Sequence, residues 1–181
     1  LELLDKVDAV SIVVPTQLHH QVAKPFLERG IHVLLEKPMT VTVAEADDLI
    51  ETATKSGAVL QIGHLERFNS AVLALEGVLD KPMFIESHRL AAFNPRGADV
   101  SVILDLMIHD IDIIQNIVGS DIDRIDVNGV SVLTDDVDIA NARLQFNNGC
   151  VANVTASRVS MNGQRKMRIF QHDAYVSIDF Q

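Results

Sequence analysis

The sequence predicts an α/β fold, in which the C-terminal half of a doubly wound (Rossmann-like) parallel sheet is followed by an α+β open-sheet domain. Three short apolar runs have the length of buried parallel strands: residues 9–14, 32–35 and 58–62. The two segments between them, residues 17–29 and 43–56, have the periodicity of helices. From about residue 65 the pattern changes to alternating strands. We therefore expect two domains, residues 1–64 and 65–181.

Local signals set the ends of the two helices. Gly30 and Gly57 stand where each helix would stop, and glycine readily adopts the left-handed conformation needed there. Thr42 followed by Glu45 fits a capping box. Pro25 removes a backbone donor from the first helix, so we expect that helix to begin late or to kink. Right-handed crossovers predict both helices on one face of the sheet.

The second domain has the pattern of one long helix and several strands. The helix is predicted over residues 99–118 and ends at Gly119, and Asn148-Gly149 is a hairpin signal. The expected strands are residues 83–90, 122–133, 139–146, 151–159 and 166–180. A run of antiparallel strands after one helix predicts an open sheet. Because an exposed apolar sheet face needs a cover, we expect a homo-oligomer that forms through this sheet.

The composition excludes several classes of protein. Twenty-five acidic against 15 basic residues give a net charge of −10, which disfavours nucleic-acid binding. Cys150 is the single cysteine and cannot form an internal disulfide, and residues 1–6 are too charged for a signal peptide. No apolar run approaches the roughly 18 to 20 residues of a membrane span. We expect a cytoplasmic protein with no membrane or nucleic-acid partner.

Polar residues follow the predicted parallel strands where a ligand would bind. Thr16 and His19 come after the first strand, and Glu36 and Lys37 come after the second. In doubly wound sheets, ligands bind beyond the carboxyl ends of the strands. A lysine after a strand is also an ordinary surface residue, and that alternative stays open. The position of Lys37 before Pro38, which restricts the local backbone, favours a functional role.

The long helix carries a narrow polar stripe. At 100° per residue, Asp105, His109, Asp112 and Asn116 fall within about 60° of one another, and nearly all other positions are apolar. A stripe facing water is one interpretation, but short Asp, His and Asn side chains favour a lined cavity. An aspartate one turn before a histidine suits a general base. The stripe also has enough ligands for a metal on paper, yet without cysteines or a His-rich motif we predict no metal site.

Several short motifs occur in one order along the chain: Pro15-Thr16 with His19, Glu36-Lys37-Pro38, Gly63-His64 with Arg67-Phe68-Asn69, Leu104-Asp105 with His109-Asp110-Ile111-Asp112, and Phe146 to Gly149. In these motifs and their order, the chain resembles the Gfo/Idh/MocA oxidoreductases over nearly its whole length. The resemblance implies a nicotinamide-dependent dehydrogenase that uses NAD or NADP. A non-catalytic dinucleotide- or sugar-binding regulatory protein of the same fold is the alternative.

The resemblance also implies roles for individual residues. His109 would be the proton acceptor, Asp105 its catalytic partner, and Lys37 a catalytic residue beside the nicotinamide and the reacting hydroxyl. Thr16, His19, Glu36 and Lys37 would border the cofactor. Residues 1–64 would form a partial dinucleotide-binding domain, and residues 65–181 a substrate and oligomerisation domain that is incomplete at its C-terminus.

The substrate implied by the resemblance is a small sugar or nucleotide sugar. The stretch from Gly63 to Asn69 is similar to that of family members that oxidise the 3-hydroxyl of UDP-N-acetylglucosamine. Arg67, Asn69, Arg89 and Arg96 would then contact the diphosphate or the sugar. Each arginine alone is an ordinary surface residue, but together they would supply a positive field in an acidic protein.

The family's opening strand and Gly-x-Gly-x-x-Gly turn, whose helix N-terminus holds pyrophosphate, do not occur in these 181 residues. We therefore expect a truncated fragment of a longer enzyme. By itself, such a fragment is predicted to bind the cofactor poorly.

Overall fold

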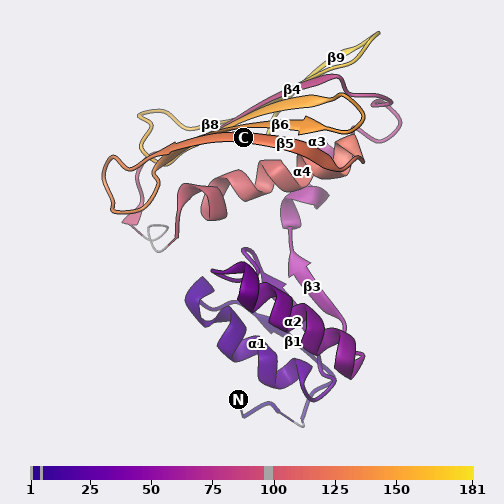
Figure 1. Cartoon of the computed structure of the whole chain (residues 1–181), viewed down its shortest axis with the longest axis vertical. Helices are drawn as coiled ribbons and strands as arrows, with labels where there is room; N and C mark the ends of the chain where they lie inside the picture. Colours follow the sequence, from indigo (N-terminus) through magenta and orange to yellow (C-terminus); the bar gives the residue numbers. More distant parts are fainter. Residues whose placement is uncertain (1, 5, 96–99) are drawn as a thin grey trace. The chain divides into compact units, whose positions relative to one another are not determined.

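A computed structural model describes residues 2–4, 6–95 and 100–181. The chain divides into two compact units, Leu1–His64 and Leu65–Gln181, which we call the N-terminal and the C-terminal unit. Figure 1 labels their helices and strands. Each unit is described by itself.

The N-terminal unit contains a parallel sheet of three strands in the order β1-β2-β3. Its elements are β1 (Ala9–Ile12), η1 (Thr16–Leu18), α1 (His19–Leu27), β2 (His32–Glu36), α2 (Val43–Ser56) and β3 (Leu60–Gly63). The alternation of strand and helix confirms the predicted α/β pattern. Helix α1 begins at His19, two residues later than the pattern starts, because a 3-10 turn precedes it, and Pro25 lies inside it.

The strands of this sheet are buried on one face only. In β2, Val33 and Leu35 are buried, whereas Leu34 between them is 42% exposed. The buried side chains pack with Leu27 of α1 and Leu49 of α2 in one core. The prediction that both helices lie on one face of the sheet is therefore confirmed, and neither of them covers the other face of β2.

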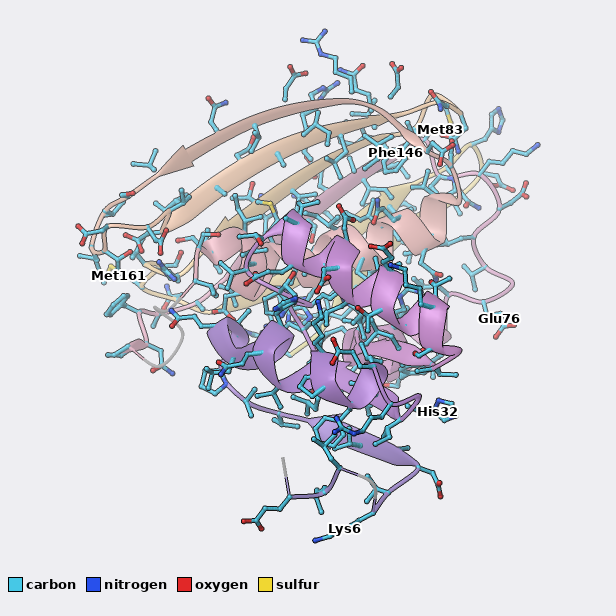
Figure 2. The ribbon with its side chains drawn as sticks, turned by 60° about the horizontal axis from the view of Figure 1, so that its bottom comes forward. Lys6, His32, Glu76, Met83, Phe146 and Met161 are labelled. Carbon is cyan, nitrogen blue, oxygen red and sulfur yellow. The ribbon has the colours of Figure 1, made fainter. Side chains whose placement is uncertain are left out.

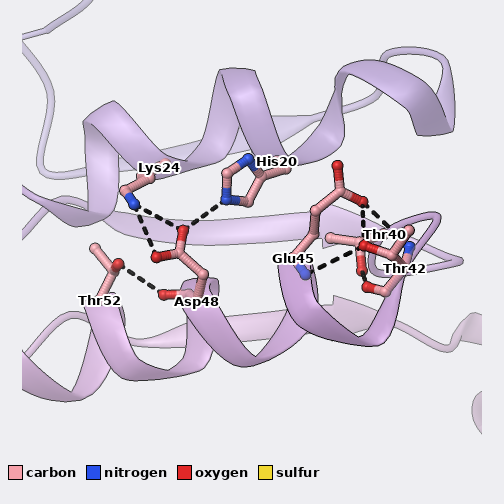
Figure 3. Close-up of polar contacts among 7 residues, drawn as sticks. All are labelled: His20, Lys24, Thr40, Thr42, Glu45, Asp48 and Thr52. Atoms are coloured by element: carbon pink, nitrogen blue, oxygen red, sulfur yellow. Dashed lines mark hydrogen bonds and ion pairs between the residues drawn. The ribbon is translucent and has the colours of Figure 1, made fainter.

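The local signals for α2 are confirmed. The Glu45 amide donates to Thr42 Oγ1 at 3.3 Å, and the Thr42 amide donates to Glu45 Oε2 at 3.1 Å, which completes the capping box (Figure 3). Gly57 ends the helix with a φ of 72°. These contacts satisfy backbone groups that the helix termini leave without partners.

A polar cluster joins α1 to α2. Asp48 of α2 lies 2.7 Å from Lys24 Nζ and 2.6 Å from His20 Nε2, both on α1 (Figure 3). Hydrogen bonds from Lys24 and then His20 hold the pKa of the Asp48 carboxyl below its usual value. The cluster is part of the surface between the two helices, and no chemistry was predicted for it.

The C-terminal unit is built on a mixed sheet of six strands in the order β5-β6-β7-β4-β8-β9. The strands are β4 (Phe84–Leu90), β5 (Ile122–Val130), β6 (Ile139–Phe146), β7 (Val151–Ser157), β8 (Gln164–Phe170) and β9 (Tyr175–Asp179). The open-sheet prediction is confirmed, and the Asn148-Gly149 turn joins β6 to β7. Two details differ. The β4 strand pairs in parallel with β7, and the single strand expected over residues 166–180 is the β8–β9 hairpin.

The long helix is not uniform. A π-helical turn, η4 (Ile103–Met107), precedes α4 (Ile108–Val118), which ends at Gly119 with a φ of 58°. The predicted helix start at Asp99 lies outside the described residues. Two short elements absent from the prediction, η2 (Leu65–Phe68) and α3 (Ser70–Leu73), open this unit.

Helix α4 covers one face of the sheet, which we call the inner face (Figure 1). Its core combines Ile113 and Ile114 of α4 with sheet residues such as Ile85, Met167 and Ile169. Figure 2 shows Met83 and Phe146 at one end of this sheet, and Met161 on the loop after β7, where it is 98% exposed. Among the described residues, no helix is long and apolar enough to cross a membrane.

The opposite, outer face of the sheet is polar over much of its area. Arg168 lies 3.0 Å from Glu86, and Arg143 donates to Asn153 at 3.1 Å. An aromatic cluster of Phe84, Phe170 and Tyr175 occupies one part of it. The outer face is therefore apolar only in part, because charged and amide side chains alternate outward along the strands.

Asp138 is the centre of a buried hydrogen-bond network between β5 and β6. Burial alone would raise the pKa of its carboxyl, but the Thr134 amide, the Arg158 guanidinium and the Leu133 and Val132 amides all donate to it and hold the pKa well below its usual range. Arg158 also donates to the carbonyl oxygen of Val100 at 2.6 Å. The network thus anchors the segment that leads into the π turn.

This network predicts a specific loss of stability in acid. A carboxyl with a lowered folded pKa stabilises the protein fully above its ordinary pKa of about 4, and the contribution is lost as pH falls through the folded value. Asp138→Asn should therefore be less stable than wild type at pH 7 in urea unfolding, and the difference should shrink on acidification. Asp179→Asn, at an exposed position, is the matched control. A difference for Asp138→Asn that stays constant from pH 7 to pH 3 would contradict the prediction.

Candidate active site

Two loops of the N-terminal unit meet at the carboxyl edge of its sheet. They follow the neighbouring parallel strands β1 and β2, so they leave the sheet at the same edge. The His19 ring lies between them, with Nδ1 2.8 Å from the Pro38 carbonyl oxygen and Nε2 2.9 Å from that of Val14. The side chain is 1% exposed. We therefore reassign His19 from cofactor contact to support of the two loops, because both ring nitrogens face backbone oxygens.

The other three predicted cofactor residues lie at the same edge of the sheet: Thr16 begins η1, Glu36 ends β2 and Lys37 follows it. Thr16, Glu36 and Lys37 are each partly exposed, and the peptide bond between Lys37 and Pro38 is cis. The Glu36 carboxylate lies over Gly63 of β3, where an added Cβ would be 3.2 Å from Oε1. Gly63 thus leaves room for the Glu36 side chain. The edge thus carries a hydroxyl, a carboxylate and an ammonium group where two adjacent strands end.

In the C-terminal unit, Asp105 and His109 lie on successive turns. Asp105 is in the π turn, His109 is in the first turn of α4, and both are partly buried. The Ile108 amide donates to the Ile103 carbonyl oxygen, so this turn holds one residue more than an α turn. The uniform 100° step therefore does not apply before Ile108. The pairing of Asp105 with His109 in catalysis stays a prediction.

The C-terminal half of the predicted polar stripe, Asp112 and Asn116, has a different environment from Asp105 and His109. Arg67 of η2 donates to both carboxylate oxygens of Asp112, at 2.7 and 2.6 Å. This interaction raises the pKa of the Arg67 guanidinium. Asn116 is exposed and, with Arg67, lines a separate pocket of about 300 Å³. The prediction that the whole stripe lines one cavity is therefore wrong, because the η2 segment covers Asp112.

A second arginine binds the adjacent part of α4. Arg89 of β4 donates to both oxygens of Asp110, at 2.9 and 3.0 Å, and both side chains are at most 3% exposed. Glu66 Oε2 lies 3.9 Å from Arg89 Nη2, and the Phe180 ring centroid is 5.8 Å from the guanidinium carbon. We therefore withdraw Arg89 as a direct substrate contact, because its forked donors are bound to a buried carboxylate.

Asp110 is the residue that the sequence reasoning missed. It immediately follows His109, but it points to the apolar side of the helix, where a charge is costly unless it is paired. Its signal was present in the sequence. Every second residue of one predicted strand lies on the same face, and in this strand those residues are Ile85, Ser87 and Arg89. The strand therefore places one cation, Arg89, on the inner face. A lone carboxylate and a lone guanidinium on facing apolar surfaces predict an ion pair.

The remaining predicted substrate residues are only partly placed. The Asn69 side chain caps α3 by accepting a hydrogen bond from the Ala71 amide at 3.0 Å. Arg96 lies outside the described residues. In the part of the chain that the structure describes, no three His, Cys, Asp or Glu side chains are grouped to hold a metal ion.

A further cavity of about 890 Å³ lies at the far end of α4 from Asp105. It is lined by Val118, the last residue of the helix, and by Met83 and Cys150 among others. Burial raises the pKa of the Cys150 thiol, which makes it a poor nucleophile at neutral pH.

Comparison with known proteins places this arrangement in a family. Residues 1–64 match the family model described as the oxidoreductase family, NAD-binding Rossmann fold. Residues 71–176 match that of the GFO/IDH/MocA C-terminal domain. The chain belongs to the Gfo/Idh/MocA family. This membership confirms the resemblance inferred from the motifs.

Within the Gfo/Idh/MocA family, the chain is similar to enzymes with different substrates. It is 45% identical over 179 residues to UDP-N-acetylglucosamine 3-dehydrogenase of Acidithiobacillus ferrooxidans, covering 98% of this chain and 57% of that protein. It is 28% identical over 173 residues to scyllo-inositol 2-dehydrogenase (NAD(+)) of Bacillus subtilis, covering 87% and 50%. The chain thus spans about half the length of the curated relatives it matches.

Solved structures of the family have the same fold. A structure of the Acidithiobacillus ferrooxidans enzyme, GnnA, superposes with a TM-score of 0.92 at 45% identity, covering 99% of this chain and 59% of that chain. The myo-inositol 2-dehydrogenase of Lactobacillus plantarum has a TM-score of 0.84 at 19% identity, covering 98% and 59%, which shows the shared fold alone.

Proposed function

We propose that the full-length protein is a nicotinamide-dependent oxidoreductase that oxidises a hydroxyl carbon of a nucleotide sugar, namely C3 of UDP-N-acetylglucosamine. The observation that carries this proposal is the 45% identity to UDP-N-acetylglucosamine 3-dehydrogenase over 98% of the chain. The residues predicted for the chemistry, Lys37, Asp105 and His109, lie in the two family regions. The cytoplasmic location expected from the sequence is part of the same proposal.

The residues at the carboxyl edge of the N-terminal sheet fit the nicotinamide half of a dinucleotide. His19 holds the two loops together, and Thr16, Glu36 and Lys37 offer donors and acceptors along them. We propose that these three residues border the cofactor, whether NAD or NADP. When bound, the nicotinamide ring accepts a hydride and with it two electrons from the sugar carbon.

The protein's side chains would handle the proton that leaves at the same time. As the carbonyl forms, the hydroxyl proton passes to His109 as general base. Asp105, one turn earlier, would orient the imidazole and stabilise its charge. Lys37 would stabilise negative charge that develops on the substrate oxygen. The reaction is balanced because the C–H and O–H bonds break while one C=O bond forms.

The test follows the reduced-nicotinamide absorbance band with the purified full-length protein. UDP-N-acetylglucosamine, UDP-glucose and scyllo-inositol are each offered with NAD and with NADP. We expect reduction with UDP-N-acetylglucosamine in preference to the other two. Binding of dinucleotide without reduction by any of them would instead favour the non-catalytic regulatory protein.

We also propose that the protein is a homo-oligomer and that the outer face of the six-stranded sheet contributes to its interface. The proposal rests on the aromatic cluster of Phe84, Phe170 and Tyr175, in which Phe170 is 36% and Tyr175 58% exposed on a face that is polar over much of its area. Sedimentation of wild type and Tyr175→Ser would test it. A monomeric wild-type protein would overturn it.

A further inference from the structure

The inner face of the C-terminal sheet carries a second arginine beside Arg89. Arg165 of β8 is directly opposite Arg89 of β4 in the antiparallel ladder. Residues directly opposite one another in a ladder share a face of the sheet, about 5 Å apart. Met167 and Ile169 follow Arg165 at two-residue steps and are buried in the core under α4. Arg165 therefore continues the inner-face row of β8.

Arg165 differs from the other arginines near this face in its electrostatic environment. Arg67 is bound to Asp112, Arg89 to Asp110 and Arg158 to Asp138. Arg165 is exposed, and within the part of the chain that the structure describes no carboxylate is bound to its guanidinium. It therefore keeps an unneutralised positive charge in a chain of net charge −10.

On the same strand, the cations of the outer face differ from Arg165 because each lies close to a carboxylate. Lys166 and Arg168 point to the outer face, and each faces a carboxylate. Lys166 Nζ lies 3.5 Å from Asp179, and Arg168 Nη2 lies 3.0 Å from Glu86. The strand thus neutralises its outward cations and leaves the inward one available to an anion.

The position of Arg165 also suits a long, bipartite substrate. Arg89, its cross-strand neighbour, binds Asp110, and Asp110 directly follows His109. Arg165 is thus on the strand next to Arg89, and Arg89 in turn binds the first turn of α4 through Asp110. In a nucleotide sugar the diphosphate is attached at C1 of the ring, so it is displaced from the carbon oxidised at C3. Because Arg165 is connected to this helix turn only through Arg89 and Asp110, it suits a substrate group that is displaced from the reacting carbon.

We propose that Arg165 binds the diphosphate of the nucleotide-sugar substrate and so determines the preference for nucleotide sugars over free sugars. This proposal rests on the proposed function. It replaces Arg89, whose donors are bound to Asp110. A guanidinium forms paired hydrogen bonds to phosphate oxygens, which an ammonium cannot reproduce in the same geometry.

The experiment measures steady-state kinetics of full-length Arg165→Ala with UDP-N-acetylglucosamine. The KM for the nucleotide sugar should rise by about 10- to 100-fold, which is the range for losing hydrogen bonds to a charged group. The kcat and the KM for the dinucleotide should change little, and Arg165→Lys should recover part of the loss. Arg168→Ala removes the same residue type from the outer face of the same strand and should leave the KM near the wild-type value.

A calorimetric titration with UDP alone separates this proposal from the proposed function. Weaker UDP binding by Arg165→Ala than by wild type and Arg168→Ala supports the role of Arg165, even if the wild-type protein does not turn over the nucleotide sugar. Equal UDP binding by all three proteins, equal loss in both variants, or no UDP binding by wild type overturns it.

Discussion

Replacing His109 with alanine in the full-length protein is expected to lower kcat by about 100- to 10,000-fold, the usual contribution of a general base. The hydroxyl proton must leave as the hydride departs, and alanine has no group to accept it. The KM for the dinucleotide should change little, because the predicted cofactor residues lie in the N-terminal unit. Stopped-flow or steady-state measurement of nicotinamide reduction gives kcat, and circular dichroism checks that the fold of the variant is native.

Asn116→Ala is the matched control for His109. Asn116 lies on the same helix and was predicted on the same stripe, but it is exposed and lines the separate pocket beside Arg67. Its replacement should leave kcat within about twofold of wild type if Asp112 and Asn116, the C-terminal half of the stripe, are outside the reaction site. A folded His109→Ala variant with undiminished turnover would exclude His109 as the base.

Breaking the Arg89–Asp110 pair should have the largest effect on stability. Both side chains are almost fully buried, so Arg89→Ala leaves an uncompensated carboxylate inside the C-terminal unit. Removing one partner of a buried pair costs about 3–5 kcal/mol. We expect Arg89→Ala to lower the free energy of unfolding by that amount, and Asp110→Ala to have a similar effect. Urea unfolding monitored by far-ultraviolet circular dichroism measures both.

The double variant Arg89→Met with Asp110→Leu separates charge burial from packing. It removes both charges and keeps apolar volume, so it should be more stable than either single alanine variant. The exposed pair of Arg124 and Asp126 provides the control, since Arg124→Ala should cost about 1 kcal/mol or less. If Arg89→Ala costs no more than Arg124→Ala, the buried pair does not stabilise α4 on the sheet.

The two parts of the fold were predictable to different degrees. In the N-terminal unit, the capping box at Thr42 and the glycine stop at Gly57 are local signals, and both are observed. Their energetics depend on residues within one or two turns, so the sequence pattern is sufficient. The apolar run of β2 does not show by itself that Leu34 is exposed, whereas the handedness of the crossovers does predict that both helices lie on one face of the sheet.

The π turn before α4 shows a different limit. Residues 103–107 have the composition of an ordinary apolar helix, and helical periodicity alone assigns them to one. The extra residue in that turn alters the angular relation between Asp105 and the rest of the stripe. Its surroundings include contacts from distant segments, such as the Val102 amide donating to the carbonyl oxygen of Val137. Contacts of this kind lie outside any window of local sequence.

The sequence by itself determined the α/β class, the family and the residue types available for chemistry, with Lys37, Asp105 and His109 as the predicted catalytic set. These depend on periodicity and on motifs of a few residues. Only the tertiary structure decided which charges are already neutralised. Arg67 and Arg89 are bound to carboxylates on α4, whereas Arg165 is not bound to a carboxylate among the described residues. The physical reason is that a charge pairs with whatever the fold brings within a few ångströms, and partners 21 to 45 residues apart in sequence are set by the packing of whole elements.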